Sequence, residues 1–126
     1  MDTPGAVTLI FQAVLPFIVF SGAWTKPVRI TMQGGTNVSF SPSVDYLNHV
    51  LLPTLARIGL PPITCKVNWR GWSTGRAQVG SVTFTITPMP RGQTLPAFEL
   101  RQPGEVVKFT AIVLAPPSYF PMCMSF

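Results

Sequence analysis

The sequence predicts a small α/β (α+β) unit in which two helices pack on a small mixed sheet, with an extra hairpin at the C-terminal side. Segments with helical spacing of apolar residues alternate with segments in which every second residue is apolar. The length of 126 residues suits one domain and leaves no room for a second. The 14 prolines and 10 glycines interrupt the chain often, which excludes long continuous helices.

Charge is sparse and biased toward the basic side. Asp, Glu, Lys and Arg make up 10% of the chain, against roughly 25% in an average soluble domain. This excludes a charge-rich disordered tail and a coiled coil, and it indicates an interior-rich piece of a larger assembly. Nine Lys and Arg against four Asp and Glu give a net charge of +5. That bias favours anionic partners such as RNA or nucleotide phosphates, although the basic residues are scattered singly.

The first element is an apolar run from Ala6 to Phe20. We interpret it as a buried helix over Val7–Leu15 that ends near Pro16. The run is short for a membrane span of about 20 residues, and it lacks the basic segment that precedes a signal-peptide core. We therefore expect no stable membrane association. A small membrane-anchored protein that uses this run is a second hypothesis.

A strand and a turn come next. Val28, Ile30 and Met32 alternate with polar residues, which predicts a half-buried strand. Gly34 and Gly35 follow in a turn, where glycine tolerates a positive φ.

A second helix is predicted from Ser41 to Gly59. Ser41 suits the N-cap, Pro42 the first helical position, and Asp45 the first turn. One apolar face repeats at helical spacing, formed by Val44, Leu47, Leu51, Leu55 and Ile58. Gly59 provides the C-terminal stop, and Pro53 is expected to kink the helix because it removes one backbone bond.

Two further strands and a hairpin complete the unit. Alternation over 63–70 and over 82–87 predicts the strands. Phe98–Leu100 and Val106–Leu114, joined by the turn sequence Gln-Pro-Gly-Glu, predict the hairpin. Residues 115–126 have no period and are expected to be irregular.

Residue types and spacings alone predict no catalytic residue and no metal site. Cys65 and Cys123 lack zinc-ligand spacing, and two cysteines are too few for a disulfide framework, so we expect a reducing compartment. Cys65 is interpreted as a small core residue. His49, the single histidine, is interpreted as a helix surface residue.

Three blocks of sequence resemble the RNA 3'-terminal phosphate cyclase family. They are Asp2–Pro16, Gly34–Leu47, and His49–Pro53 continued by Arg57–Gly59, and they keep the order and spacing of the family. The resemblance runs from about Asp2 to about Leu114. It predicts a partial cyclase domain over 1–114 and an irregular tail over 115–126.

The resemblance implies a fold of repeated α/β units, each with a four-stranded sheet backed by two helices. It also implies that ATP adenylates a catalytic histidine and that AMP passes to an RNA 3'-phosphate. The neighbouring 2'-hydroxyl then attacks and leaves a 2',3'-cyclic phosphate, with Mg2+ screening the triphosphate. The implied partners are ATP or AMP and an RNA 3'-phosphate end. The implied location is the nucleus (nucleoplasm), with the cytoplasm as the second choice.

Four residues match nucleotide-binding positions of the family. Gln12 matches a glutamine that faces the nucleotide, and its amide can donate to phosphate oxygens. Pro42 matches a proline that packs against adenine, and Asp45 and Tyr46 fall on the same wall. Gln12 could instead be a helical glutamine bonded to backbone, and Asp45 could serve as a helix cap alone.

The positions at which the sequence differs from the family indicate whether the chain can be active alone. The family's nucleophilic histidine lies beyond the matching segments, and His49 does not match it. In the loop after Gly71, Arg76 stands where the family carries a lysine and more glycines. We therefore expect a cyclase fragment that is inactive alone, with self-association through exposed sheet edges. Two further hypotheses are a cyclase-like protein of ribosomal RNA processing and a non-catalytic RNA-binding module.

Overall fold

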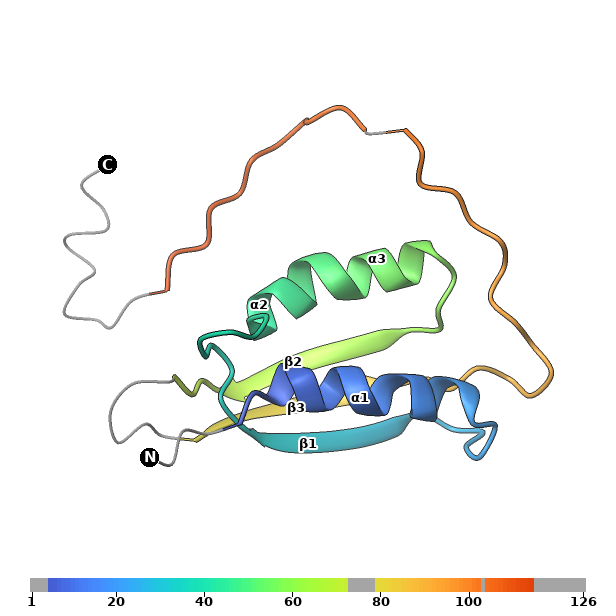
Figure 1. Cartoon of the computed structure of the whole chain (residues 1–126), viewed down its shortest axis with the longest axis horizontal. Helices are drawn as coiled ribbons and strands as arrows, with labels where there is room; N and C mark the ends of the chain where they lie inside the picture. The colour runs from blue at the N-terminus through green and yellow to red at the C-terminus, as the bar shows by residue number, and fades with distance from the viewer. Residues whose placement is uncertain (1–4, 73–78, 103, 115–126) are drawn as a thin grey trace.

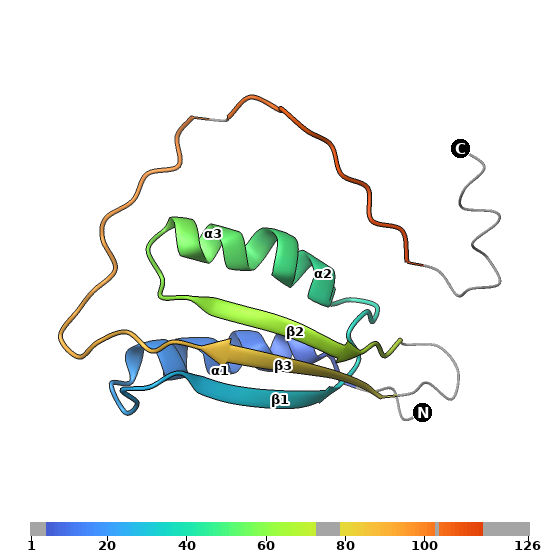
Figure 2. The same ribbon diagram turned by 180° about the vertical axis from the view of Figure 1, so that it is seen from behind.

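The protein has two layers, with the helices on one face of a three-stranded sheet in the described part of the chain (Figures 1 and 2). A computed structural model describes residues 5–72, 79–102 and 104–114. The elements are α1 (Val7–Phe20), β1 (Val28–Gly34), α2 (Val44–Tyr46), the π-helical segment η1 (Leu47–Leu51), α3 (Leu52–Arg57), β2 (Ile63–Trp69) and β3 (Gly80–Ile86). The α/β class is confirmed, and α2, η1 and α3 together form the second predicted helix.

The sheet has the order β1-β3-β2, and both pairings are antiparallel. The prediction of a mixed sheet was wrong in this detail. Parallel pairing between described residues is restricted to two isolated bridges, Ala6 with Gly35 and Asn37 with Trp72. β3, the last strand in the described chain, lies between the two earlier strands and pairs with both.

Alternation along most of each strand directs one set of side chains toward the core and the other away from it. Ile30, Phe84 and Cys65 lie in one register row and pack in or against the core. α1 covers this face, and the Phe11 ring stacks on the Phe84 ring with centroids 4.2 Å apart. Both phenylalanines are fully buried, as are Val44 and Leu47 of the second helix. The two helices and the sheet therefore share one core.

α1 is longer than predicted. It continues past Pro16 to Phe20, although proline removes one backbone hydrogen bond from a helix. Ile18 and Val19 are buried in the core, so packing of the last turn offsets that loss. In the part of the chain that the structure describes, no helix combines the length and apolar character needed to cross a membrane.

The second helix begins later than predicted. Ser43, not Ser41, is the N-cap, since its hydroxyl accepts a hydrogen bond from the Tyr46 backbone N–H at 3.1 Å. The Ser41 hydroxyl instead donates to the Val38 carbonyl at 3.2 Å. Pro42 therefore lies before the cap and not at the first helical position.

The helical turn just before Pro53 is wider than an α-helical turn. The segment before it is π-helical, and the Leu52 backbone N–H bonds to the Leu47 carbonyl five residues earlier. Pro53 then falls in the first turn of α3, where a missing N–H costs little. The Thr54 hydroxyl donates to the Val50 carbonyl at 2.7 Å and satisfies one of the displaced backbone groups.

The predicted C-terminal hairpin is absent. Residues 87–102 and 104–114 contain no strand, and Val107 and Phe109 are almost fully exposed. This segment has strand-like composition, but it packs on no neighbouring sheet. A two-stranded hairpin without such support is only marginally stable in water. The predicted irregular tail and Arg76 lie outside the described residues.

Cys65 lies on the inner face of β2 and packs against the core, as predicted. Burial, together with the negative charge of Asp45, raises the pKa of its thiol to about 11. The thiolate is the reactive form, so we expect Cys65 to react with iodoacetamide at pH 8 about 200-fold more slowly than an unperturbed cysteine of pKa about 8.5, in proportion to its smaller thiolate fraction. Mass spectrometry of a Cys123→Ser variant measures this rate, and unfolding in urea should restore it. A fast rate in the folded protein would show that the thiol is accessible and ionised.

Candidate functional site

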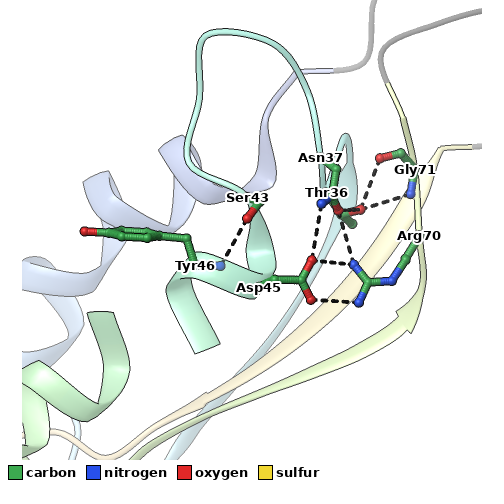
Figure 3. A network of polar contacts seen from close by, with 7 residues as sticks. All are labelled: Thr36, Asn37, Ser43, Asp45, Tyr46, Arg70 and Gly71. Atoms are coloured by element: carbon green, nitrogen blue, oxygen red, sulfur yellow. Dashed lines mark hydrogen bonds and ion pairs between the residues drawn. The ribbon is translucent and has the colours of Figure 1, made fainter. Parts of the chain in front are cut away.

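An ion pair lies at the end of the sheet where β1 and β2 finish (Figure 3). Arg70, directly after β2, donates from Nη1 to Asp45 Oδ2 at 2.7 Å and from Nη2 to Asp45 Oδ1 at 2.8 Å. Both side chains are largely shielded, with exposed fractions of 28% for Arg70 and 21% for Asp45. This two-bond geometry is the strongest arrangement available to an arginine and a carboxylate.

The loop after β1 completes the network. The Asn37 amide donates to Asp45 Oδ2 at 3.2 Å, and its Oδ1 accepts from Arg70 at 3.3 Å. The backbone N–H groups of Thr36 and Asn37 both donate to the Gly71 carbonyl, at 2.9 and 3.2 Å. The Thr36 hydroxyl also lies 3.1 Å from both the N and the O of Gly71. The loop, the start of α2 and the end of β2 are thereby held together.

Close backbone approach at this end of the sheet requires glycine. A Cβ atom on Gly80 would lie 2.5 Å from the Gly71 nitrogen and 2.8 Å from the Thr36 side chain. A Cβ atom on Gly34 would lie 2.4 Å from the Gly5 carbonyl oxygen. Gly80 therefore allows the strand ends to converge beside the ion pair. The prediction of a turn with positive φ at Gly34 and Gly35 was wrong, because Gly34 ends β1, Gly35 bridges to Ala6, and neither has a positive φ.

The pair remains ionised near neutral pH. Hydrogen bonding from Arg70 lowers the pKa of Asp45, with Asn37 acting in the same direction and partial burial opposing it. Hydrogen bonding to Asp45 raises the pKa of Arg70. Asp45 therefore serves as an anchor for Arg70. The helix cap is provided by Ser43, so capping alone does not explain Asp45.

The structure brings three of the four predicted site residues to the start of the second helix. Pro42 is half-buried before the N-cap, and Asp45 and Tyr46 lie in α2. The Tyr46 ring points away from the ion-pair network (Figure 3), and 48% of the residue is exposed.

Gln12 lies on the exposed side of α1. Among the described residues, no hydrogen bond joins its side chain to the other three residues or to backbone.

Sequence reasoning missed Arg70, Asn37 and Thr36 as members of this site. One signal was present, because Asp45 is the only acidic residue between residues 5 and 98. A single carboxylate among seven Lys and Arg residues in that span is expected to pair with one of them. Which arginine it pairs with depends on the fold, since Arg70 is 25 positions away in sequence.

Comparison with known proteins gives a consistent result. The family model for RNA 3'-terminal phosphate cyclase matches residues 1–121. The chain is 45% identical over 58 residues to the RNA 3'-terminal phosphate cyclase of Drosophila melanogaster, which covers 46% of this chain and 15% of that protein. It is 31% identical over 112 residues to the enzyme of that name from Sulfurisphaera tokodaii, covering 89% of this chain and 30% of the relative. The chain therefore spans less than a third of the length of these relatives.

Proposed function

Because this chain belongs to the RNA 3'-terminal phosphate cyclase family, we propose that it forms part of the ATP-binding wall of an RNA 3'-phosphate cyclase. The proposed reaction is the ATP-dependent conversion of an RNA 3'-phosphate to a 2',3'-cyclic phosphate. The family match over residues 1–121 carries the proposal. In this proposal the chain recognises the nucleotide. The covalent bond to AMP is formed by the nucleophilic histidine of the family, which His49 does not match.

The surroundings of the ion pair support a recognition role. The bonds from Asp45 and Asn37 hold Arg70 in one orientation, and the loop that carries Pro42 is tied to Gly71 through Thr36. Rigid support of this kind lowers the entropy that a site loses on binding. We assign Tyr46 and Pro42 to adenine, and Asp45 to holding Arg70 in place.

The available side chains fit the chemistry of ATP. An exposed phenol ring can stack on a purine, and the Gln12 amide can donate to phosphate oxygens. When bound, ATP would supply the adenylyl group, with pyrophosphate as the leaving group. Among the described residues, no group of three or more His, Cys, Asp or Glu side chains could hold a metal. Mg2+ is therefore proposed to bind mainly through the triphosphate and its own waters.

ATP binding by the 126-residue chain tests this assignment. We expect saturable binding of ATP, measured by isothermal titration calorimetry with Mg2+ present. Replacing Tyr46 by alanine removes the stacking surface and should weaken binding about tenfold, since stacking on an aromatic ring contributes about 1–3 kcal/mol per base. Gln12→Ala should weaken binding less, by roughly the value of one hydrogen bond, about 1 kcal/mol.

Phe20→Ala is the matched control for Tyr46→Ala. Phe20 is an aromatic residue of similar exposure, 52%, at the C-terminal end of α1, whereas Tyr46 lies in α2. Its loss should leave ATP binding unchanged. An equal effect of both substitutions would show that Tyr46 is not part of the site. Absent ATP binding with retained RNA binding would favour a non-catalytic RNA-binding module.

Covalent chemistry gives a separate readout. His49 lies exposed in η1 and does not match the family's nucleophile. Incubation of this chain alone with ATP labelled at the α-phosphate should therefore leave no label on the protein. An acid-labile adduct on His49 would overturn the division between recognition and bond formation.

A further inference from the structure

No helix of the described residues covers the second face of the sheet (Figure 2), and the side chains in its central register rows are polar. Side chains on this face alternate with the core residues along each strand, so register rows define it. Arg29, Thr85 and Thr64 form one row, and Thr31, Thr83 and Lys66 form the next. Gln33, Ser81 and Asn68 continue it toward the end of the sheet that carries the ion pair. These rows contain hydroxyl, amide and cationic side chains and no acidic residue. At the end of β2 the exposed Trp69 pairs with Ser81, which is itself buried.

Hydrogen bonds between neighbouring strands hold the polar side chains in place. The hydroxyl oxygens of Thr31 and Thr83 lie 3.0 Å apart. The Asn68 amide donates to both the Ser81 hydroxyl and the Thr83 hydroxyl at 3.0 Å. The open face is thus a flat surface with ordered hydrogen-bonding groups.

The charge on this face has no local counterpart. Asp45 is the only acidic residue between residues 5 and 98, and Arg70 already neutralises it. Among the described residues, Arg29 and Lys66 form no salt bridge, and both are exposed. Their Cα atoms lie two strands and two residues apart, about 12 Å by ordinary sheet spacing. Two cations at that separation can contact two different anionic groups of one extended ligand.

We propose that this open face binds the phosphate backbone of single-stranded RNA. A polyanion matches two unpaired cations on a surface that lacks carboxylates. Hydroxyl and amide groups between the cations can bond to phosphate oxygens and ribose hydroxyls. The rows of Arg29 and Lys66 contain no aromatic ring, so contacts in these two rows are expected to be with the RNA backbone. The choice of RNA as the polymer rests on the proposed function.

Salt-dependent binding of an unstructured RNA tests the proposal. The probe is a fluorescent oligouridylate of about 12 nucleotides with a 3'-hydroxyl end, within the site sizes typical of single-strand binding, and fluorescence anisotropy measures its affinity for the full chain. The variant carries both Arg29→Thr and Lys66→Thr, which keep strand propensity on a face already rich in threonine. For single strands, each lost phosphate contact reduces the slope of log K against log salt by about 0.7. The double variant should therefore lose about 1.4 from the slope. Between roughly 50 and 200 mM salt, its RNA affinity should fall by a factor about sevenfold smaller than the factor for the wild type.

A matched double variant controls for net charge. Arg57→Gln with Lys108→Gln also removes two exposed cations, one at the end of α3 and one in the segment after the sheet. This variant should retain the wild-type slope. Equal losses in both double variants would overturn the proposal in favour of non-specific attraction, and so would an RNA affinity too weak to measure in the wild type. Preferential binding of polyglutamate over the oligouridylate would assign the face to an acidic protein.

ATP binding separates this inference from the proposed function. The Arg29→Thr and Lys66→Thr variant should bind ATP as the wild type does, since neither residue belongs to the Tyr46 site. RNA binding on the sheet face without ATP binding would leave the inference standing and reject the ATP site. Far-ultraviolet circular dichroism checks that both double variants remain folded.

Discussion

Phe84→Ala is expected to lower the free energy of unfolding by about 3–5 kcal/mol, the usual cost of removing a buried phenylalanine. Phe84 is fully buried in the central strand, and its ring stacks on Phe11 of α1 at a centroid distance of 4.2 Å. Removing it opens a cavity between the sheet and the helix that covers it. Urea denaturation followed by circular dichroism measures the loss.

Two further variants show whether the loss of stability in Phe84→Ala comes from the aromatic stack with Phe11 or from the loss of apolar volume in general. Phe84→Leu keeps most of the apolar volume and should cost well under half as much as alanine. Phe20→Ala removes a half-exposed ring and should change stability by less than about 1 kcal/mol. A similar small effect of Phe84→Ala would mean that α1 does not pack on the sheet as described.

Arg70→Gln is expected to lower the free energy of unfolding by about 2 kcal/mol at pH 7, because it leaves the partly buried Asp45 carboxylate without its main partner. Hydrogen bonds to charged groups contribute about 1.5–3 kcal/mol. Urea denaturation at pH 7 measures the cost. Arg57→Gln, which removes an exposed arginine from the end of α3, should cost less than about 0.5 kcal/mol.

The cost of Arg70→Gln should depend on pH in a defined direction. Arg70 lowers the pKa of Asp45 below its ordinary value of 3.8. A carboxyl whose pKa is lowered by folding stabilises the protein above the unfolded-state value, and this stability is lost as pH falls through the folded-state value. The difference between wild type and Arg70→Gln should therefore be full at pH 7 and shrink below about pH 4. A difference that stays constant down to about pH 2.5 would show that the charge of Asp45 does not contribute.

An Asp45→Asn variant completes a double-mutant cycle. If the two side chains act as one unit, Asp45→Asn and Arg70→Gln together should cost less than the sum of the single changes. The same variants extend to function, because loss of the pair releases the loop that carries Pro42. ATP binding should then weaken even though Tyr46 is unchanged.

Local pattern was sufficient to predict the element order from α1 to β3. Alternation of Val28, Ile30 and Met32, and of Val82, Phe84 and Ile86, marks the residues that face the core, and the structure confirms those faces. This works because the side-chain period of a strand or helix is set by its backbone geometry alone. Resemblance to the cyclase family was visible in the same segments.

Other features depended on interactions between distant parts of the chain. α1 continues past Pro16 because Ile18 and Val19 are buried, and Val106–Leu114 forms no strand because it packs on no sheet, although its composition favours one. Asp45 was predicted at the site but Arg70 was not. Their pairing requires the ends of β1 and β2 and the start of α2 to converge at one edge of the sheet, and that depends on strand order and glycine packing. The periodicity of a segment predicts which face each of its residues occupies. The partner of a residue depends instead on which other chain segments fold against that face.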